Sequence, residues 1–221
     1  MKTSNSSSPM QIEVWSDILC PFCYIGKRKL ELALEELGIS DSARVEWKSF
    51  QLNPDLVGDA TKSIHQYLAE VKGWSIEQSR EMNQRVSEIA SSVGLTFKLD
   101  SSKLANSLDA HRLLHLARVE GKQDVVSQAL FMAYFSESKD IADRSTLKAI
   151  GLSAGIAAQQ LDALFSSAMY QEAVLADQQE AAELGVRGVP YFVFNRQYAV
   201  SGAQEVAVFK QVLEKVQQQY A

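Results

Sequence analysis

The sequence has few of the residues that mark several common classes of protein. Its 221 residues include 4 prolines and 11 glycines, too few for a collagen-like or low-complexity chain. Its 22 Lys and Arg are outnumbered by 27 Asp and Glu, and no basic cluster is dense enough to follow a phosphate backbone. The net charge of −5 favours solubility and gives no sign of a nucleic-acid partner.

Long apolar runs are also missing. No stretch approaches the roughly 20 apolar residues needed to cross a bilayer, so we expect no membrane contact through a spanning helix. The first nine residues, MKTSNSSSP, lack the apolar segment of a signal peptide. We therefore expect residues 1–9 to form a disordered tail and the protein to be cytoplasmic.

Cysteine is scarce, since only Cys20 and Cys23 are present. The cytoplasm keeps thiols reduced, so a purely structural disulfide is a poor explanation for this pair. The remaining composition, 46% hydrophobic and 22% charged, supplies ample material for a buried core. A chain of this length can form one large domain or one domain that carries a big insertion.

The spacing of apolar residues changes twice along the chain, from strands to helices and back to strands. The predicted strands cover residues 12–15, 45–52, 191–194 and 198–200. The predicted helices cover residues 21–37, 64–71, 82–93, 104–120, 124–135, 145–151, 158–168 and 170–184, with a last one around 209–216. This order predicts an α/β fold, in which a small mixed sheet is interrupted in sequence by a helical block.

The same order suggests how the chain divides. We assign residues 10–60 and 185–221 to one discontinuous domain that contains the sheet, and residues 61–184 to a helical insertion domain.

A Cys-x-x-Cys motif follows the first strand and stands at the start of the first helix. The first sulfur would lie near unpaired backbone N–H groups and the positive end of the helix macrodipole, which favours its thiolate form. Because the thiolate is the nucleophile in disulfide exchange, we expect Cys20 to react first and the more buried Cys23 to resolve the pair. Pro21 and Phe22 lie between the cysteines and are expected to shape their redox equilibrium.

Two other interpretations of the cysteines stay open. His111 and His115 have the H-x3-H spacing that could complete a zinc site with the cysteine pair. Their distance in sequence from Cys23 is far longer than in a compact zinc finger, and the leucines around them indicate helix packing, so we predict no metal. The other alternative is a pair of inert, packed cysteines, because free cysteine is commonly buried.

A second feature is the glycine-containing loop from Gly185 to Pro190, which ends where a strand is predicted to begin. Alone, such a proline is typically an ordinary trans residue at a strand edge. Because this chain also has a strand, a Cys-x-x-Cys motif and a helix in that order, we expect the Val189–Pro190 peptide bond to be cis. The Val189 backbone would then face outward and could pair with an extended substrate.

In combination, these segments resemble a known family. Residues 16–26, SDILCPFCYIG, are similar to the active-site segment of the FrnE-like branch of the DsbA-type thiol oxidoreductases. Further positions resemble the family in the same order along the chain: Asn106, AHRL at 110–113, LFMAYF at 130–135, GVPYFVF at 188–194 and SGAQ at 201–204. The resemblance implies a thioredoxin fold with a large helical insertion, a nucleophilic Cys20, a resolving Cys23 and a cis Pro190 that faces them.

The chain departs from the family pattern at two points. Phe22 stands where the family commonly has tryptophan, so an indole donor is lost. The second cysteine pair that some relatives carry near the C-terminus is missing, which rules out an internal relay of disulfides.

Two alternative functions stand beside this one, the first from the same superfamily and the second from a different class of protein. Glutathione-dependent isomerases that resemble 2-hydroxychromene-2-carboxylate isomerase have serine at the position of Cys20, and the helical block could shape a pocket for their kind of small molecule. A redox-inactive peptide-binding or chaperone module is the other. We predict instead a dithiol/disulfide oxidoreductase that needs no cofactor and acts on protein or small-molecule thiols, with glutathione as one possible partner.

Overall fold

The computed structural model describes residues 9–58 and 61–219, and centres on a four-stranded sheet in the order β2-β1-β3-β4. Strand β1 (Met10–Ser16) pairs in parallel with β2 (Ala43–Ser49) and antiparallel with β3 (Tyr191–Phe194), which pairs antiparallel with β4 (Tyr198–Ser201). The predicted mixed sheet is therefore confirmed. The expected disordered tail lies outside the described residues, apart from Pro9.

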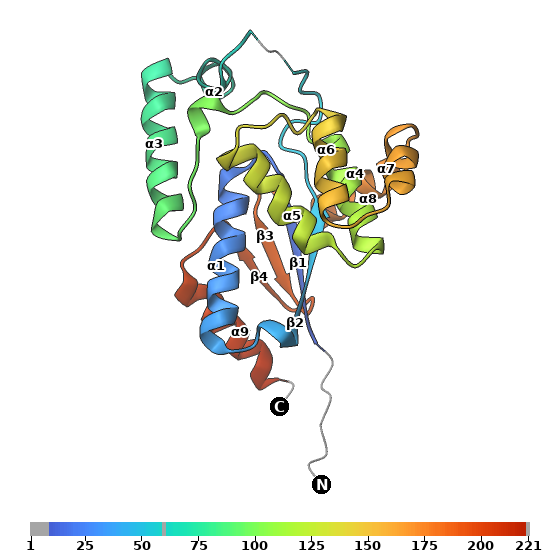
Figure 1. Cartoon of the computed structure of the whole chain (residues 1–221). Helices are drawn as coiled ribbons and strands as arrows, with labels where there is room; N and C mark the ends of the chain where they lie inside the picture. Colours follow the sequence, from blue (N-terminus) through green and yellow to red (C-terminus); the bar gives the residue numbers. More distant parts are fainter. Residues whose placement is uncertain (1–8, 59–60, 220–221) are drawn as a thin grey trace.

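Helices make up most of the rest of the described chain. In chain order they are α1 (Pro21–Leu37), α2 (Ile64–Lys72), α3 (Ile76–Ser92), α4 (Leu108–Val119), α5 (Gln123–Phe131), α6 (Arg144–Ser153), α7 (Ala158–Phe165), α8 (Gln171–Glu183) and α9 (Val206–Gln218). Short 3₁₀ turns cover Ser40–Ser42 and Leu99–Ser101, and a π-helical turn, Met132–Ser136, continues α5. Helices α2 to α8 thus lie in sequence between β2 and β3, as predicted (Figure 1).

The two faces of the sheet are covered by different helices. Alternate side chains of a strand point to opposite faces, so Ile12 and Val14 pack with α1 and α9, whereas Trp15 faces α8. The buried indole of Trp15 also donates a hydrogen bond to the backbone oxygen of Asp177 in α8 (2.9 Å). The sheet is therefore the middle layer of three, with α1 and α9 on one face and α8 on the other.

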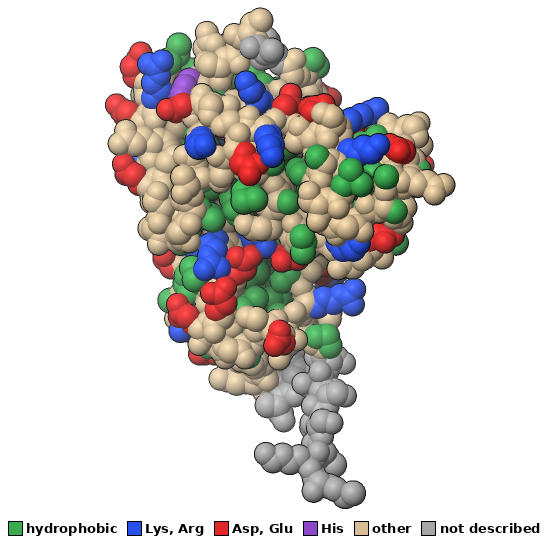
Figure 2. Space-filling model, viewed as in Figure 1, with side chains coloured by type: hydrophobic (Ala, Val, Ile, Leu, Met, Phe, Trp, Pro, Cys, Tyr) green, Lys and Arg blue, Asp and Glu red, His purple; other side chains and the backbone are tan. Residues whose placement is uncertain are grey.

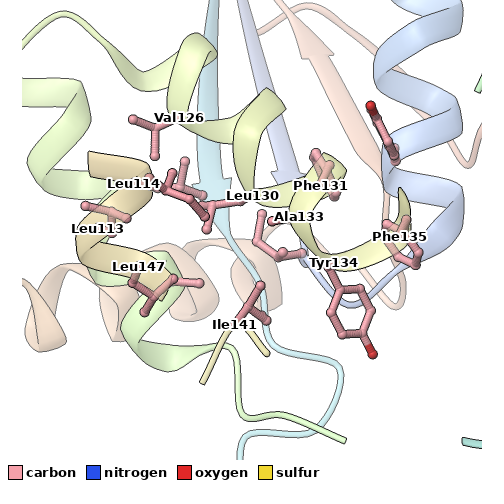
Figure 3. Packing of buried hydrophobic residues seen from close by; sticks show 14 of the residues in the cluster. Leu113, Leu114, Val126, Leu130, Phe131, Ala133, Tyr134, Phe135, Ile141 and Leu147 are labelled. Atoms are coloured by element: carbon pink, nitrogen blue, oxygen red, sulfur yellow. The ribbon is translucent and has the colours of Figure 1, made fainter. Parts of the chain in front are cut away.

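A row of aromatic rings connects the helical block to α1. Tyr24 of α1 stacks on Phe131, with ring centroids 5.0 Å apart, and Phe97 stacks on Phe135 at 4.8 Å. Figure 3 shows Phe131 and Phe135 at one side of the buried cluster and the leucines of α4 and α6 at the other, with Leu130 and Ala133 between them. Aromatic pairs of this kind add attraction beyond their buried area. The first helix and the insertion consequently share one core.

Two sequence-based expectations differ from the structure. The second strand ends at Ser49 rather than at residue 52, since the N–H of Leu52 turns away to bond the Asp17 carboxylate (2.8 Å). The apolar spacing also predicts a buried stripe at Met82, Val86, Ile89 and Val93, which is right at Val86 but wrong at Met82 and Ile89, since these two side chains are 37% and 40% exposed. The buried positions of α3 are instead Ser79, Asn83, Val86 and Ala90.

Figure 2 shows acidic and basic side chains interspersed over the face seen in Figure 1, without a large area of one sign. None of the helices in the described ranges is both long and apolar enough to cross a bilayer.

Arg112 gives a test of how the insertion is held together. Its buried guanidinium donates to the backbone oxygens of Leu164, Ser167 and Met169 and to the Asp109 carboxylate. Replacing it by methionine leaves these acceptors unpaired, so we expect Arg112→Met to lower the free energy of unfolding by about 3 kcal/mol. Urea denaturation measures this loss.

Arg144→Met is the matched control, because Arg144 also binds Asp109 but its side chain is 58% exposed. We expect it to cost about 1 kcal/mol or less. Equal losses for the two variants would contradict the role given to Arg112.

Candidate active site

The cysteine pair stands at the N-terminus of α1, where the sequence places it. Cys20 is the capping residue, with extended backbone angles (φ −92°, ψ 113°), and Pro21 is the first residue of the helix. The Cys20 N–H donates to the Asp17 oxygen and the Cys23 N–H donates to the Cys20 oxygen, both at 3.0 Å. A proline costs nothing at the first helical position, because an N–H there would have no partner inside the helix.

The two sulfurs differ in their access to solvent. Both thiols are free; Cys20 is 5% exposed and Cys23 is fully buried. Phe22, between them in sequence, is 40% exposed. Cys20 is therefore the sulfur that a substrate can reach.

The loop before β3 lies directly against Cys20. The Cys20 thiol donates a hydrogen bond to the Val189 oxygen (Sγ to O, 3.6 Å), and the Val189–Pro190 peptide bond is cis. Helix α1 approaches this loop closely at Gly26, where a Cβ atom would lie 3.0 Å from Pro190 Cγ and 3.0 Å from Phe192 Cζ. Cys20, Val189 and Pro190 thus meet at one place, although most of the chain separates them.

The surroundings of Cys23 hold it in the thiol form. Burial raises the pKa of Cys23 well above its usual value, and the neighbouring Cys20 sulfur raises it further. The nearby Ser16 hydroxyl and Asp17 backbone lower the pKa of Cys23, but burial outweighs them. At neutral pH the buried sulfur therefore keeps its proton.

Asp17 is a residue of the site whose role the sequence analysis missed. Its fully buried carboxylate accepts the N–H groups of Leu19 (3.2 Å) and Leu52 (2.8 Å), and His111 Nε2 lies 3.4 Å from Oδ1. These contacts fix the turn between β1 and α1 that carries Cys20. The available signal was an acidic residue at the end of an apolar strand, directly before the motif.

The same contacts bear on the zinc alternative. His111 faces Asp17, while His115 Nε2 lies 3.1 Å from Asp177 Oδ2 and 3.1 Å from Ser49 Oγ. Within residues 9–58 and 61–219, no three His, Cys, Asp or Glu side chains are grouped to hold a metal ion. The described part of the chain therefore does not contain the proposed zinc site, and the two histidines serve as buried partners of carboxylates.

A cavity of about 330 Å³ opens beside the motif. Cys20, Pro21 and Phe22 form one end of it, and side chains of α2, α3 and the segment before α4 form the rest. The site thus combines a reactive dithiol with room for a molecule next to it.

A strand, a dithiol at a helix N-terminus and an opposing X-Pro loop define a thioredoxin-fold protein with an inserted helical block. Residues 11–214 match the DSBA-like thioredoxin domain family. The chain belongs to this family, and the predicted fold class and DsbA-type membership are confirmed. The FrnE-like branch and the domain boundaries stay predictions.

Known proteins resemble the chain over nearly its full length. A probable DsbA oxidoreductase from Streptomyces coelicolor is 33% identical, with a TM-score of 0.89, over 96% of this chain and 92% of that structure. The uncharacterized protein YwbO of Bacillus subtilis (strain 168) is 24% identical over 216 residues, 94% of this chain and 98% of that protein.

A more distant structure shares the fold. The cytosolic disulfide reductase DsbM from Pseudomonas aeruginosa is 17% identical, with a TM-score of 0.66, over 95% of this chain and 99% of that one. A structure of DsbM with GSH is 19% identical, with a TM-score of 0.64, over 94% of this chain and 99% of that one.

Gly26 tests the close approach of α1 to the Pro190 loop. We expect Gly26→Ala to lower the free energy of unfolding by about 1 kcal/mol, because crowding of Pro190 and Phe192 outweighs the helix propensity that alanine gains. Chemical denaturation measures the change. In the control Gly188→Ala, the added Cβ meets no atom within 4 Å, and we expect a change of less than about 0.5 kcal/mol. A Gly26 variant as stable as this control would argue against tight packing.

The raised pKa of Cys23 predicts a dependence of stability on pH. The unfolded chain loses the Cys23 proton near pH 8.5, while the folded state still binds it, so stability falls as the pH rises above that value. The slope due to Cys23 approaches about 1.4 kcal/mol per pH unit. Urea denaturation of the reduced protein between about pH 8 and pH 10 should show this fall, and Cys23→Ala should show a flatter profile. Identical profiles would contradict the assignment.

Proposed function

We propose that the protein is a dithiol/disulfide oxidoreductase in which Cys20 is the nucleophile and Cys23 resolves the mixed disulfide. The observation that carries this proposal is the unequal burial of two free thiols at one helix N-terminus, 5% against 0% exposed. Cys20 caps the positive end of the α1 dipole, and its buried partner Cys23 keeps its proton. Pro21, Phe22, Val189 and Pro190 shape the site around them.

The exchange balances in two steps. The Cys20 thiolate attacks one sulfur of a substrate disulfide, forms a mixed disulfide and releases the other sulfur as a thiolate, which takes up the Cys23 proton. The Cys23 thiolate then attacks Cys20 Sγ, so the Cys20–Cys23 disulfide forms and the second substrate sulfur leaves as a thiolate, which takes its proton from solvent. The Ser16 hydroxyl and Asp17 N–H face the Cys23 sulfur and stabilise its charge during the second step. Two electrons pass from the protein to the substrate, and the reverse sequence oxidises a dithiol.

Protein disulfides and small disulfides are both proposed substrates. The Val189 backbone beside Cys20 offers a polar contact for an extended peptide, and the exposed Phe22 offers an apolar one. The likeness to DsbM, which has been solved with GSH, supports glutathione as a thiol partner and the cytoplasm as the compartment. The isomerase and peptide-binding alternatives differ from this proposal in not requiring the Cys20 sulfur.

The first test is catalysed reduction of insulin with dithiothreitol as the thiol donor. We expect the wild-type protein to accelerate precipitation of the insulin B chain, and Cys20→Ser to give only the uncatalysed rate, because a hydroxyl does not exchange with disulfides. If Cys20→Ser retained the wild-type rate, the proposed function would be wrong and a binding module would be favoured.

Cys23→Ala provides the second half of this test. With the resolving sulfur removed, the mixed disulfide between Cys20 and the substrate should accumulate and be visible by mass spectrometry without reductant. The double variant Cys20→Ser, Cys23→Ala is the matched control and should give no adduct. An adduct on the double variant would be unrelated to the motif.

A further inference from the structure

The cavity beside Cys20 has a predominantly apolar wall. Its sides come from Tyr67 and Leu68 of α2, Val86 of α3 and Phe135 of the turn after α5. Its volume of about 330 Å³ falls in the range of small-molecule sites, which bury an apolar body and fix it by a few polar groups. Since Cys20 lines one end, a sulfur-containing molecule bound in this cavity could place its sulfur atom next to the Cys20 sulfur.

The polar groups at this cavity favour a ligand oxygen that accepts hydrogen bonds. The charged side chain at its edge is the exposed Lys72, and no carboxylate of the described residues lines it. Asn53 also lines it, but its amide already donates to the Tyr67 hydroxyl (3.1 Å). The cavity therefore favours a ligand that carries a negative charge or a hydrogen-bond acceptor. To bind such a group away from its edge, the cavity needs a hydrogen-bond donor inside.

Asn83 supplies such a donor. It occupies an inward position of α3 and is 7% exposed, and its amide nitrogen Nδ2 has no hydrogen-bond partner among the residues that the structure describes. A buried donor without a partner is destabilising, and native proteins rarely keep one without a reason. A ligand oxygen in the cavity would satisfy it.

We infer that this cavity binds the non-reacting part of a small disulfide substrate, which has an aromatic or similarly bulky apolar body and a carboxylate or carbonyl oxygen that accepts from Asn83. The inference rests on the proposed exchange at Cys20 and names its substrate class. A small molecule is favoured over a protein substrate because the cavity volume of about 330 Å³ falls in the range of small-molecule sites.

The reaction follows the same exchange with the substrate oriented. The Cys20 thiolate attacks the sulfur attached to the seated body, so a Cys20–substrate disulfide forms and the small outer thiol leaves. Cys23 then attacks Cys20 Sγ, and the seated molecule departs as a thiol. Positioning the reacting sulfur raises the rate of the first step.

Three mixed disulfides of 2-mercaptoethanol test this inference. Their second thiols are 4-(mercaptomethyl)benzoic acid, benzyl mercaptan and 2-mercaptoethanol itself, which provide ring and carboxylate, ring alone and neither. Each rate of reduction by the reduced wild-type protein in a single turnover is divided by the rate with dithiothreitol, which removes intrinsic reactivity. We expect each added group, first the ring and then the carboxylate, to raise the normalised rate by about tenfold.

The variant Asn83→Leu assigns the carboxylate preference. We expect the ratio of the benzoate rate to the benzyl rate to fall about tenfold toward one, because leucine keeps the volume but cannot donate. Gln84→Leu is the matched control, since Gln84 is an exposed amide on the same helix and should leave this ratio unchanged. Leu68→Trp, which fills the cavity, should reduce the advantage of the ring.

The outcomes separate this inference from the function on which it rests. If all three disulfides react at the same normalised rate in the wild type, or if Asn83→Leu preserves the benzoate preference, the cavity does not select the substrate and the inference is overturned. In that case catalysed reduction of insulin still supports the oxidoreductase. If the wild type reduces neither insulin nor any of the three disulfides, the proposed function itself fails.

Discussion

The site depends on one contact, between the start of α1 and the start of β3. Cys20 and Val189 are 169 residues apart in the chain, yet the Cys20 sulfur lies 3.6 Å from the Val189 oxygen. The pairing of β1 with β3 fixes the position of the Val189–Pro190 loop relative to the start of α1. Because Gly26 has no side chain, α1 can lie against Pro190 and Phe192. The buried Lys29 of α1 adds a second tie, because its ammonium group binds the Glu205 carboxylate (2.7 Å) just before α9. These contacts therefore keep the two halves of the site together, although the whole helical block lies between them in sequence.

The different roles of the two sulfurs follow from their burial and from their positions at the end of the helix. Cys20 caps α1 and Cys23 lies in its first turn, so the two sulfurs are neighbours and the difference between them comes from position and burial. Cys20 stands at the cap, where backbone N–H groups favour a negative charge, while Cys23 lies one turn deeper, where burial keeps the proton on the sulfur. Asp17 contributes by fixing the turn before the helix through the N–H groups of Leu19 and Leu52.

Much of this arrangement could be predicted from the sequence, because it follows from local rules. Apolar alternation predicted the strands, helical spacing predicted most helices, and the order of the elements predicted a sheet interrupted by a helical block. Features that need tertiary contacts were missed. The buried face of α3 includes Ser79 and Asn83, polar residues that no apolar periodicity predicts, so only Val86 of the predicted stripe within this helix is buried. Likewise, the pairing of Asp17 with His111 and the shape of the cavity arise from residues that are distant in sequence.

The central claim is that the two sulfurs exchange a bond reversibly, and equilibration with glutathione tests it most directly. The protein is incubated at graded ratios of reduced to oxidised glutathione, quenched with acid, alkylated and examined by mass spectrometry. The account predicts a single two-electron transition between the dithiol and an intramolecular Cys20–Cys23 disulfide, with the same midpoint from either direction. Independent glutathionylation of the two cysteines, or the absence of an intramolecular disulfide at every ratio, would contradict it.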